Sequence, residues 1–180
     1  MKVLVVAATE PELGGLPGLV CGIGPVEAAA VTSQALAERL PEAVLHVGVA
    51  GARRTSGIRP PKLVLGSASV YCDIAAEIPV LRGAMPDPAL LAIARRVLPD
   101  AHVLPIGTSA AVDGSHGVDV EAMEGFGVLR ACALAGVPAI ELRAVANEIE
   151  EEDRARWHLA EALEALRLVI PDLVRAIGAA

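Results

Sequence analysis

The sequence contains no basic tract, and its overall charge is acidic. Fifteen Lys and Arg residues against 22 Asp and Glu residues give a formal net charge of −7. The adjacent pairs Arg53-Arg54 and Arg95-Arg96 are typical of solvated surface. Because nucleic-acid binding depends on many contacts between basic side chains and phosphates, the composition argues against a nucleic-acid partner.

Long hydrophobic runs are missing too, although hydrophobic residues make up 54% of the chain and the mean hydropathy is +0.54. A membrane-spanning helix needs about 18 to 20 consecutive apolar residues, so we expect no membrane partner. The apolar run at the N-terminus soon meets Glu10 and Glu12 and lacks a small-residue cleavage site. This pattern indicates a first strand rather than a signal peptide.

Paired cysteines and metal-binding motifs are also missing. Cys21, Cys72 and Cys132 are odd in number and far apart, without CxxC spacing, and the four histidines show no HExxH spacing. These absences predict no disulfide, no metal and no cofactor. A reducing cytoplasm is the simplest setting for such a chain.

What the sequence does contain is an alternation of strand-like and helix-like segments. Predicted strands cover residues 3–8, 19–24, 43–52, 62–71, 102–107 and 137–146, with 62–71 forming one strand or two. Predicted helices cover 25–40, 87–98 and 123–135, and a last helix begins near residue 151 and should kink at Pro171. Continuously apolar strands separated by helices indicate a sheet buried on both faces. With 180 residues, the chain suits a single α/β domain spanning 1–180.

In open α/β sheets, ligands bind at the carboxyl ends of the strands. Those ends fall at 9–12, 22–24, 48–51, 71–73, 107–109 and 146–147, and this set is the candidate site. The glycines of "GIG" and "GVAGA", Gly51 among them, would let a ligand approach the backbone closely. Neither segment matches GxGxxG or the phosphate-binding GxxxxGKS/T motif, so dinucleotide or nucleoside triphosphate binding is weakly supported.

Glu12 and Asn147 are candidate site residues that also have ordinary structural interpretations. Glu12 follows the first strand, where it is either a surface carboxylate near a helix start or a general base. Asn147 ends a strand, where an Asn in a turn is common. Glu141 and Arg143 share one face of that same strand, which favours a structural ion pair.

Ser109, Asp113 and His116 carry the residue types of a catalytic triad. They lie on one short loop, however, and no GxSxG elbow surrounds the serine. Turn chemistry is therefore the favoured interpretation of this group.

Glu124, in the stretch "VEAMEGFGV" (120–128), is harder to explain by structure alone. The helix positions on its own face, Gly127, Val128 and Ala131, offer neither a cation nor a polar group. Burying an unpaired carboxylate costs several kcal/mol, whereas a helix N-terminus offsets only about 0.3–1 kcal/mol. A partner must come from elsewhere, and a ligand with hydroxyls or developing positive charge is a natural candidate if that partner is not protein.

Several stretches match a known family from end to end: "ATEPE", "GIGPVEAA", "VGVAGA", "VYCDIAAE", "EAMEG" and "GVPAIELRAVANEIEEEDRARW". With these motifs the chain resembles the nucleoside phosphorylase/nucleosidase superfamily, and within it the futalosine hydrolases. The last stretch is the most specific, since strand–Arg–small–Asn is followed ten residues later by Trp157. The segment between Asp73 and Gly107 is shorter than is usual in the family, so loops that cover the substrate elsewhere are trimmed.

The resemblance implies a three-layer domain with a mixed, mostly parallel twisted sheet, and cleavage of an N-glycosidic bond between ribose and a purine. Carried over by position, Glu12 would activate water, Met123 and Glu124 would bind the ribose hydroxyls, and Asn147 would face the purine. Phe126 is a candidate to stack on the base, with core packing as the alternative.

Two features indicate which activity within the superfamily this chain resembles most. Phosphorylases of this superfamily hold phosphate with arginine in the first loop and arginine and serine near the third strand end. This chain has Glu10 and Glu12 in the loop and His46 and Val49 at the strand, which favours hydrolysis over phosphorolysis. Nucleosidases that release adenine carry Asp at the position of Asn147, whose amide cannot supply a titrating proton. Asn147 therefore indicates hypoxanthine as the leaving base.

Three positions depart from the family pattern: Ala146 replaces a usual serine, Glu152 a usual arginine, and Phe126 a small residue. The expected activity is hydrolysis of futalosine to hypoxanthine and dehypoxanthine futalosine, a step of menaquinone biosynthesis. Alternatives are a methylthioadenosine/S-adenosylhomocysteine nucleosidase, a purine nucleoside phosphorylase, or a non-catalytic nucleoside-binding protein. Since family members are usually dimers or larger, we also expect a homodimer or higher homo-oligomer, which the apolar surplus fits.

Overall fold

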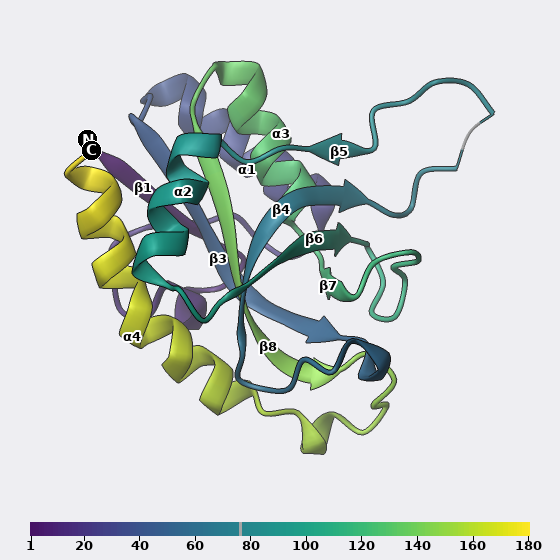
Figure 1. The fold of residues 1–180 in the computed structure, drawn as a ribbon. Coiled ribbons are helices and arrows are strands. Elements are labelled where there is room, and N and C mark those ends of the chain that lie inside the picture. Colours follow the sequence, from purple (N-terminus) through teal and green to yellow (C-terminus); the bar gives the residue numbers. More distant parts are fainter. Residues whose placement is uncertain (76) are drawn as a thin grey trace.

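The computed structural model describes residues 1–75 and 77–180. Along the chain the elements are β1 (Val3–Ala7), η1 (Glu10–Leu13), β2 (Leu19–Val20), α1 (Pro25–Glu38), β3 (Ala43–Ala52), η2 (Arg54–Ser56), β4 (Leu63–Tyr71), β5 (Gly83–Ala84), α2 (Pro88–Val97), β6 (His102–Thr108), β7 (Val120–Ala122), α3 (Gly125–Ala135), β8 (Ala139–Glu148), η3 (Arg154–Arg156) and α4 (Leu159–Gly178), where η marks a 3-10 helix (Figure 1).

Most elements form close to their predicted bounds. β3 covers residues 43–52 as predicted, and β4 is one strand. α1 and α2 begin with Pro25 and Pro88, whose fixed φ suits the first turn of a helix, and the Asp87 side chain caps α2. α3 ends before Gly136, which has the left-handed φ of 69° that favours glycine at this cap. Pro171 lies inside α4.

Three predicted bounds are wrong. Residues 120–122 form strand β7, so α3 begins at Gly125. The last helix begins only at Leu159, because η3 forms a separate turn and Trp157 lies outside α4. β2 has only two residues, since Gly22 takes a φ of 80° that ends the extended backbone.

Over the described residues, eight strands form one sheet in the order β2-β1-β3-β7-β6-β4-β5, with β8 pairing to both β3 and β4. Five of the strand pairs are parallel and three (β3–β7, β4–β5 and β4–β8) are antiparallel. The predicted mixed, mostly parallel sheet is confirmed. The sequence did not reveal that β3, β8, β4, β6 and β7 pair in a closed circuit, which curls this part of the sheet into a small barrel. An apolar cluster that includes Ala50, Val64, Ile106, Val120 and Val145 packs within this part of the sheet.

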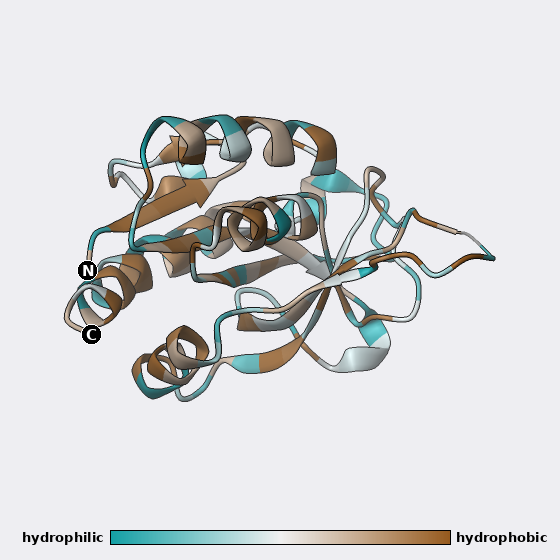
Figure 2. Cartoon of the chain, turned by 90° about the horizontal axis from the view of Figure 1, so that it is seen from above, coloured by the Kyte–Doolittle hydropathy of each residue, from teal (hydrophilic) through white to brown (hydrophobic). Residues whose placement is uncertain are grey.

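Helices cover both faces of the sheet and complete the three predicted layers. α2 and α4 pack on one face, against Val5 and Leu45. α1 and α3 pack on the other, against Val6 and Val44. Neighbouring residues of a strand point to opposite faces, so each strand contributes to both cores. Figure 2 shows hydrophobic colouring along the strands in the middle and hydrophilic stretches on the outer sides of the helices.

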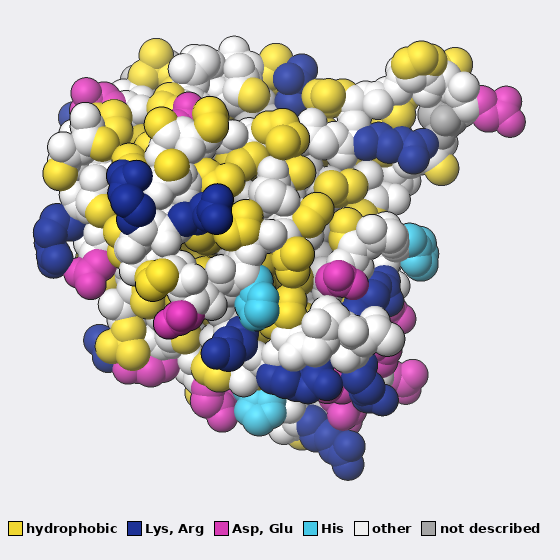
Figure 3. All heavy atoms as spheres, in the orientation of Figure 1, with side chains coloured by type: hydrophobic (Ala, Val, Ile, Leu, Met, Phe, Trp, Pro, Cys, Tyr) yellow, Lys and Arg dark blue, Asp and Glu magenta, His cyan; other side chains and the backbone are white. Residues whose placement is uncertain are grey.

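One face of the molecule shows how its charged side chains are distributed. On the face shown in Figure 3, basic and acidic side chains gather at the lower right. At the end of β8, Arg54 and Arg59 pair with Glu148. Hydrophobic side chains are scattered over the rest of this face. Within the described residues, no helix is both long and apolar enough to cross a membrane.

Candidate active site

The candidate site lies on the α1/α3 side of the sheet, near the carboxyl ends of β3 and β8. In these parallel strands His46 pairs with Glu141, and Gly48 pairs with Arg143, so the four positions share one face. A Cβ atom on Gly48 would clash with Arg143 Nη1 and would lie 2.9 Å from Glu12 Oε1. The missing side chain of Gly48 therefore lets the guanidinium and the Glu12 carboxylate approach one spot above β3.

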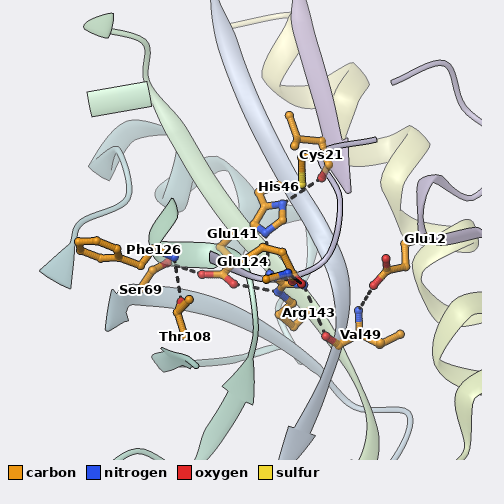
Figure 4. A network of polar contacts seen from close by, with 12 residues as sticks. Glu12, Cys21, His46, Val49, Ser69, Thr108, Glu124, Phe126, Glu141 and Arg143 are labelled. Carbon is orange, nitrogen blue, oxygen red and sulfur yellow. Dashed lines mark hydrogen bonds and ion pairs between the residues drawn. The ribbon is translucent and has the colours of Figure 1, made fainter. Parts of the chain in front are cut away.

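Arg143 lies at the centre of the site with its side chain fully buried. Its Nε donates to Glu141 Oε1 at 2.8 Å, which confirms the ion pair predicted from the sequence. Its Nη2 also lies 3.3 Å from Glu124 Oε2 and 2.6 Å from His46 Nε2. Figure 4 shows these three side chains gathered around the guanidinium, with Glu12 on the far side of Val49.

Glu124 occupies the N-cap position of α3, but its side chain does not cap the helix. An N-cap side chain normally accepts from a backbone N–H of the first turn. Here the Phe126 N–H donates to Thr108 Oγ1 at 2.8 Å instead, which leaves the carboxylate free to turn into the site. There it accepts from the Gly24 N–H at 3.2 Å and pairs with Arg143. The cation that is missing from the Glu124 face of its helix is therefore supplied by β8.

Glu12 lies in η1, just after β1, and is only 6% exposed. Its Oε1 accepts from the Val49 N–H at 2.9 Å, and its Oε2 accepts from the N–H and Oγ1 of Thr9 at 2.9 and 2.7 Å. The Thr9 contacts are those of a capping box, so Glu12 does mark a helix start, but as a buried carboxylate rather than a surface one. Three donors hold it in a fixed orientation beside the space above Gly48.

Three buried carboxylates surround the single guanidinium. Burial raises the pKa of Glu124, although Arg143 and the Gly24 N–H act in the opposite direction. Burial lowers the pKa of Arg143, but Glu141, Glu124 and Glu12 outweigh it and raise that pKa above its usual range. Arg143 is therefore charged at any ordinary pH. With all carboxylates ionised, this buried cluster has surplus negative charge, which suits a developing cation and disfavours an anionic ligand.

Asn147 is the residue before the last of β8. It lies opposite Gly51 of β3 and is 8% exposed. Its Nδ2 donates to the Glu148 carbonyl at 3.0 Å, which uses one of the two amide N–H groups. A Cβ on Gly51 would lie 3.1 Å from that Nδ2, so Gly51 makes room for the amide. Trp157 fixes the loop that follows, because its Nε1 donates to the Glu151 carbonyl at 3.2 Å.

Met123 and Phe126 flank Glu124 in different ways. Met123 is half-buried in the bend between β7 and α3. The Phe126 ring stacks on Tyr71 with centroids 5.2 Å apart and an interplanar angle of 12°. Figure 4 shows this ring pointing away from Arg143, so its position fits the packing alternative better than contact with a ligand beside Glu124.

The group Ser109, Asp113 and His116 does not assemble as a triad. Ser109 is buried, whereas His116 is exposed, and the Ser109 Oγ accepts from a backbone N–H two residues on at 3.1 Å. The buried Glu121 carboxylate accepts from the N–H groups of Asp113 and Ser115 at 2.6 and 2.7 Å. The interpretation of these residues as parts of a turn is confirmed, and the Glu121 carboxylate stabilises that turn.

The sequence of this chain matches a known protein family and a known relative. Residues 17–179 match the model of the "Phosphorylase superfamily". The chain belongs to the phosphorylase superfamily. This superfamily member is 35% identical over 178 residues to the futalosine hydrolase of Streptomyces coelicolor, a match that covers 82% of the chain and 74% of that relative.

Solved structures of two nucleoside-cleaving enzymes, named as a futalosine hydrolase and an S-adenosylhomocysteine nucleosidase, share the fold. The native futalosine hydrolase of Helicobacter pylori strain 26695 superposes with a TM-score of 0.83 at 17% identity, over 100% of this chain and 98% of the other. The S-adenosylhomocysteine nucleosidase of Streptococcus pyogenes, in complex with 5-methylthiotubericidin, gives a TM-score of 0.83 at 21% identity, over 98% of this chain and 96% of the other.

Three residues that build the site of this phosphorylase superfamily member were not predicted to do so: His46, Ser69 and Thr108. Ser69 donates to Glu141 Oε2, Thr108 replaces Glu124 as the helix cap, and His46 contacts Arg143. For His46 and Ser69 the one signal was a polar residue inside an apolar strand, which the sequence of β3 and β4 does show; Thr108, at the end of β6, had no such signal. Which polar residues meet depends on strand register, and no local pattern reports that.

Proposed function

We propose that this protein hydrolyses the N-glycosidic bond of futalosine, releasing hypoxanthine and dehypoxanthine futalosine in menaquinone biosynthesis. The main support for this chemistry is that two buried carboxylates, Glu12 and Glu124, lie close to the same guanidinium, that of Arg143. The substrate follows the 35% identity to a futalosine hydrolase. We place the reaction in the cytoplasm.

Departure of a purine from ribose leaves positive charge on the sugar ring. Glu124 is fixed by Gly24 and Arg143 and is not used by its own helix, so its carboxylate can accept from the ribose hydroxyls, with half-buried Met123 beside the sugar. Those hydrogen bonds strengthen as the charge develops. Such an interaction stabilises the transition state more than the bound substrate, which is what accelerates the reaction.

The attacking water belongs above Gly48, between Glu12 Oε1 and Arg143 Nη1. Both atoms lie close over the Cα of Gly48, and together they offer an acceptor and a donor to a water beside them. Glu12 can take the proton from the water as it attacks. Its three hydrogen-bond donors fix the direction in which the remaining lone pair points.

The charges of the same buried cluster favour water over phosphate as the nucleophile. Arg143 is already paired with Glu141 and Glu124, and Glu12 occupies the Val49 N–H. A phosphate dianion would meet three carboxylates there and compete for a guanidinium that is engaged. The expected products are therefore a free base and a free sugar hydroxyl.

Asn147 supports hypoxanthine as the leaving base. One of its amide N–H groups is used by the Glu148 carbonyl, and the other remains for the purine. An amide cannot donate a titrating proton, so the base is stabilised rather than protonated by this residue. Gly51 supports the contact by leaving space for the amide.

We also propose that the protein assembles as a homodimer or larger homo-oligomer through the face formed by α1 and α3. A groove on this face is lined by Pro25, Val26, Ala29, Ala30, Ser33, Tyr71, Phe126, Gly127 and Arg130. Val26 and the neighbouring Ile23 are 77% and 63% exposed, which is unusual for apolar side chains beside an apolar groove. A Val26→Glu variant should reduce the mass measured by light scattering to that of a monomer.

The test of the activity is the release of free base. Wild-type protein is incubated with futalosine, inosine or methylthioadenosine, each with and without phosphate, and the base is identified by chromatography. Hypoxanthine from futalosine without phosphate is the expected result. Adenine release alone would contradict the Asn147 argument, phosphate dependence would contradict the hydrolase, and saturable binding without turnover would indicate a nucleoside-binding protein.

A further inference from the structure

His46 is a fully buried histidine within β3 that faces the site. Among the described side chains, it makes no hydrogen bond to Glu12 or Glu124. Its Nδ1 lies 3.0 Å from the Val6 carbonyl on β1, and its Nε2 lies 2.6 Å from Arg143 Nη2 on β8. The ring thus links both neighbouring strands at the level of the guanidinium.

These two contacts determine the proton position on the ring. A carbonyl oxygen only accepts, so Nδ1 must carry the hydrogen and donate to Val6. A guanidinium only donates, so Nε2 must be unprotonated and accept from Arg143. Burial and then Arg143 hold the pKa of His46 well below its usual value, which agrees with a neutral ring.

A neutral acceptor is well suited to this position. Arg143 already has Glu141 on its Nε and Glu124 on its Nη2, and a further carboxylate would add another buried negative charge. His46 instead accepts one Nη2 hydrogen bond without changing the net charge of the side chains around Arg143. Glu141 holds Nε and His46 holds one Nη2 hydrogen. The other Nη2 hydrogen is directed to Glu124, and Nη1 is directed toward the Val49 carbonyl, 3.5 Å away, and the space above Gly48.

We propose that His46, as the neutral Nδ1–H tautomer, is a positioning residue that sets the orientation of the Arg143 guanidinium toward Glu124 and the nucleophile. The catalytic consequence rests on the proposed function, whereas the tautomer and its contacts do not. The proposal therefore has one test that needs no turnover and one that does.

The first test reads the ring directly. In wild-type protein with 15N-labelled histidine, long-range 15N–1H spectra near neutral pH should show a protonated Nδ1 and an unprotonated Nε2 for His46, assigned by its loss in His46→Gln. An Nε2–H tautomer or a doubly protonated ring would overturn the proposal, because neither can accept from Arg143. This outcome is independent of the substrate.

The second test uses two variants that each keep one half of the ring's function. His46→Gln places an amide oxygen near the former Nε2 and retains an acceptor for Arg143, whereas His46→Asn places its amide nearer the former Nδ1 and retains a donor for Val6. Thermal melting reports whether each variant folds. We expect kcat for futalosine to fall roughly ten- to a hundredfold in His46→Asn, the size typical when an outer partner of a functional group is removed, with KM within about threefold.

His46→Gln should restore most of that loss. Wild-type kcat in a folded His46→Asn, or an equal loss in both folded variants, would overturn the proposal. If wild-type protein releases no base from futalosine, the proposed function fails, and the spectra still decide the contact between His46 and Arg143. If His46→Asn does not fold, His46→Gln and the spectra remain decisive.

Discussion

Replacing Glu124 by Gln should cut turnover strongly without destabilising the protein. The change keeps the shape and one acceptor oxygen of the side chain but removes its charge. In most buried ion pairs, removal of one partner costs about 3–5 kcal/mol, because the other charge is left uncompensated. Arg143 is not left uncompensated here, since Glu141 still pairs with it at 2.8 Å.

Attraction to Arg143 and the cost of burial oppose each other at Glu124 and are of similar size. With an effective dielectric constant of about 20, two unit charges 3.3 Å apart attract by about 5 kcal/mol. Burying a carboxylate costs several kcal/mol in practice. The pKa of Glu124 is raised by burial against the pull of Arg143, which means that desolvation outweighs the attraction. The free energy of unfolding at neutral pH should therefore stay the same or rise in Glu124→Gln.

Turnover should respond in the opposite way. A neutral amide cannot strengthen its interaction with a developing cation as a carboxylate does, and loss of one such electrostatic group typically lowers kcat by about 10²–10³. The assay measures hypoxanthine release and the melting temperature on the same preparation.

Glu121→Gln is the matched control, because Glu121 is equally buried three residues earlier but accepts from two loop N–H groups instead of facing Arg143. It should lower stability by about 1–3 kcal/mol and affect turnover far less. A Glu124→Gln protein that melts well below wild type while turning over normally would refute the reasoning.

Four further results are expected. Glu12→Gln should reduce kcat by about 10²–10⁴, the contribution of a general base, with nucleoside binding retained in calorimetry. Asn147→Asp should shift preference from 6-oxopurine toward 6-aminopurine nucleosides, measured as the ratio of kcat/KM for inosine and methylthioadenosine. Arg143→Met should lower the free energy of unfolding by about 3–5 kcal/mol, with part of the loss recovered at acid pH as the stranded carboxylates take up protons. The last result concerns pH and the raised pKa of Glu124. The contribution of Glu124 to the free energy of unfolding is fully present below the pKa that this group has in the unfolded chain. It is lost as pH rises through the raised pKa of Glu124 in the folded protein. In contrast, kcat/KM should fall as pH drops through that same raised pKa. Glu124→Gln should abolish both trends in melting and rate profiles.

Local signals in the sequence were sufficient for most elements. β3 was predicted at its observed bounds because ten mostly apolar residues run between a proline and a basic turn. α1 and α2 were located by a proline in the first turn. The two-residue strand β5 and three-residue strand β7 have no such pattern, because they pair only where the rest of the sheet already provides a neighbour.

The candidate site was predictable in part. Strand ends located Glu12 and Asn147, and the cost of an unpaired carboxylate marked Glu124 as unusual. The partner of Glu124 was not predictable, because Arg143 lies on β8, far away in the sequence. Its side chain reaches Glu124 across Gly48, which has no side chain to block it. That contact depends on the register of β3 against β8, which is a property of the assembled sheet.

Because β3, β8, β4, β6 and β7 pair in a closed circuit, the ends of the sheet are β2 and β5, each two residues long. Unpaired backbone at a long, flat sheet edge can template pairing with another chain and start aggregation. Within the described residues, the closed circuit therefore leaves only short stretches of unpaired strand backbone at the edges of the sheet. A protein in which hydrophobic residues make up 54% of the sequence is thereby guarded against strand-to-strand association by its topology rather than by surface charge.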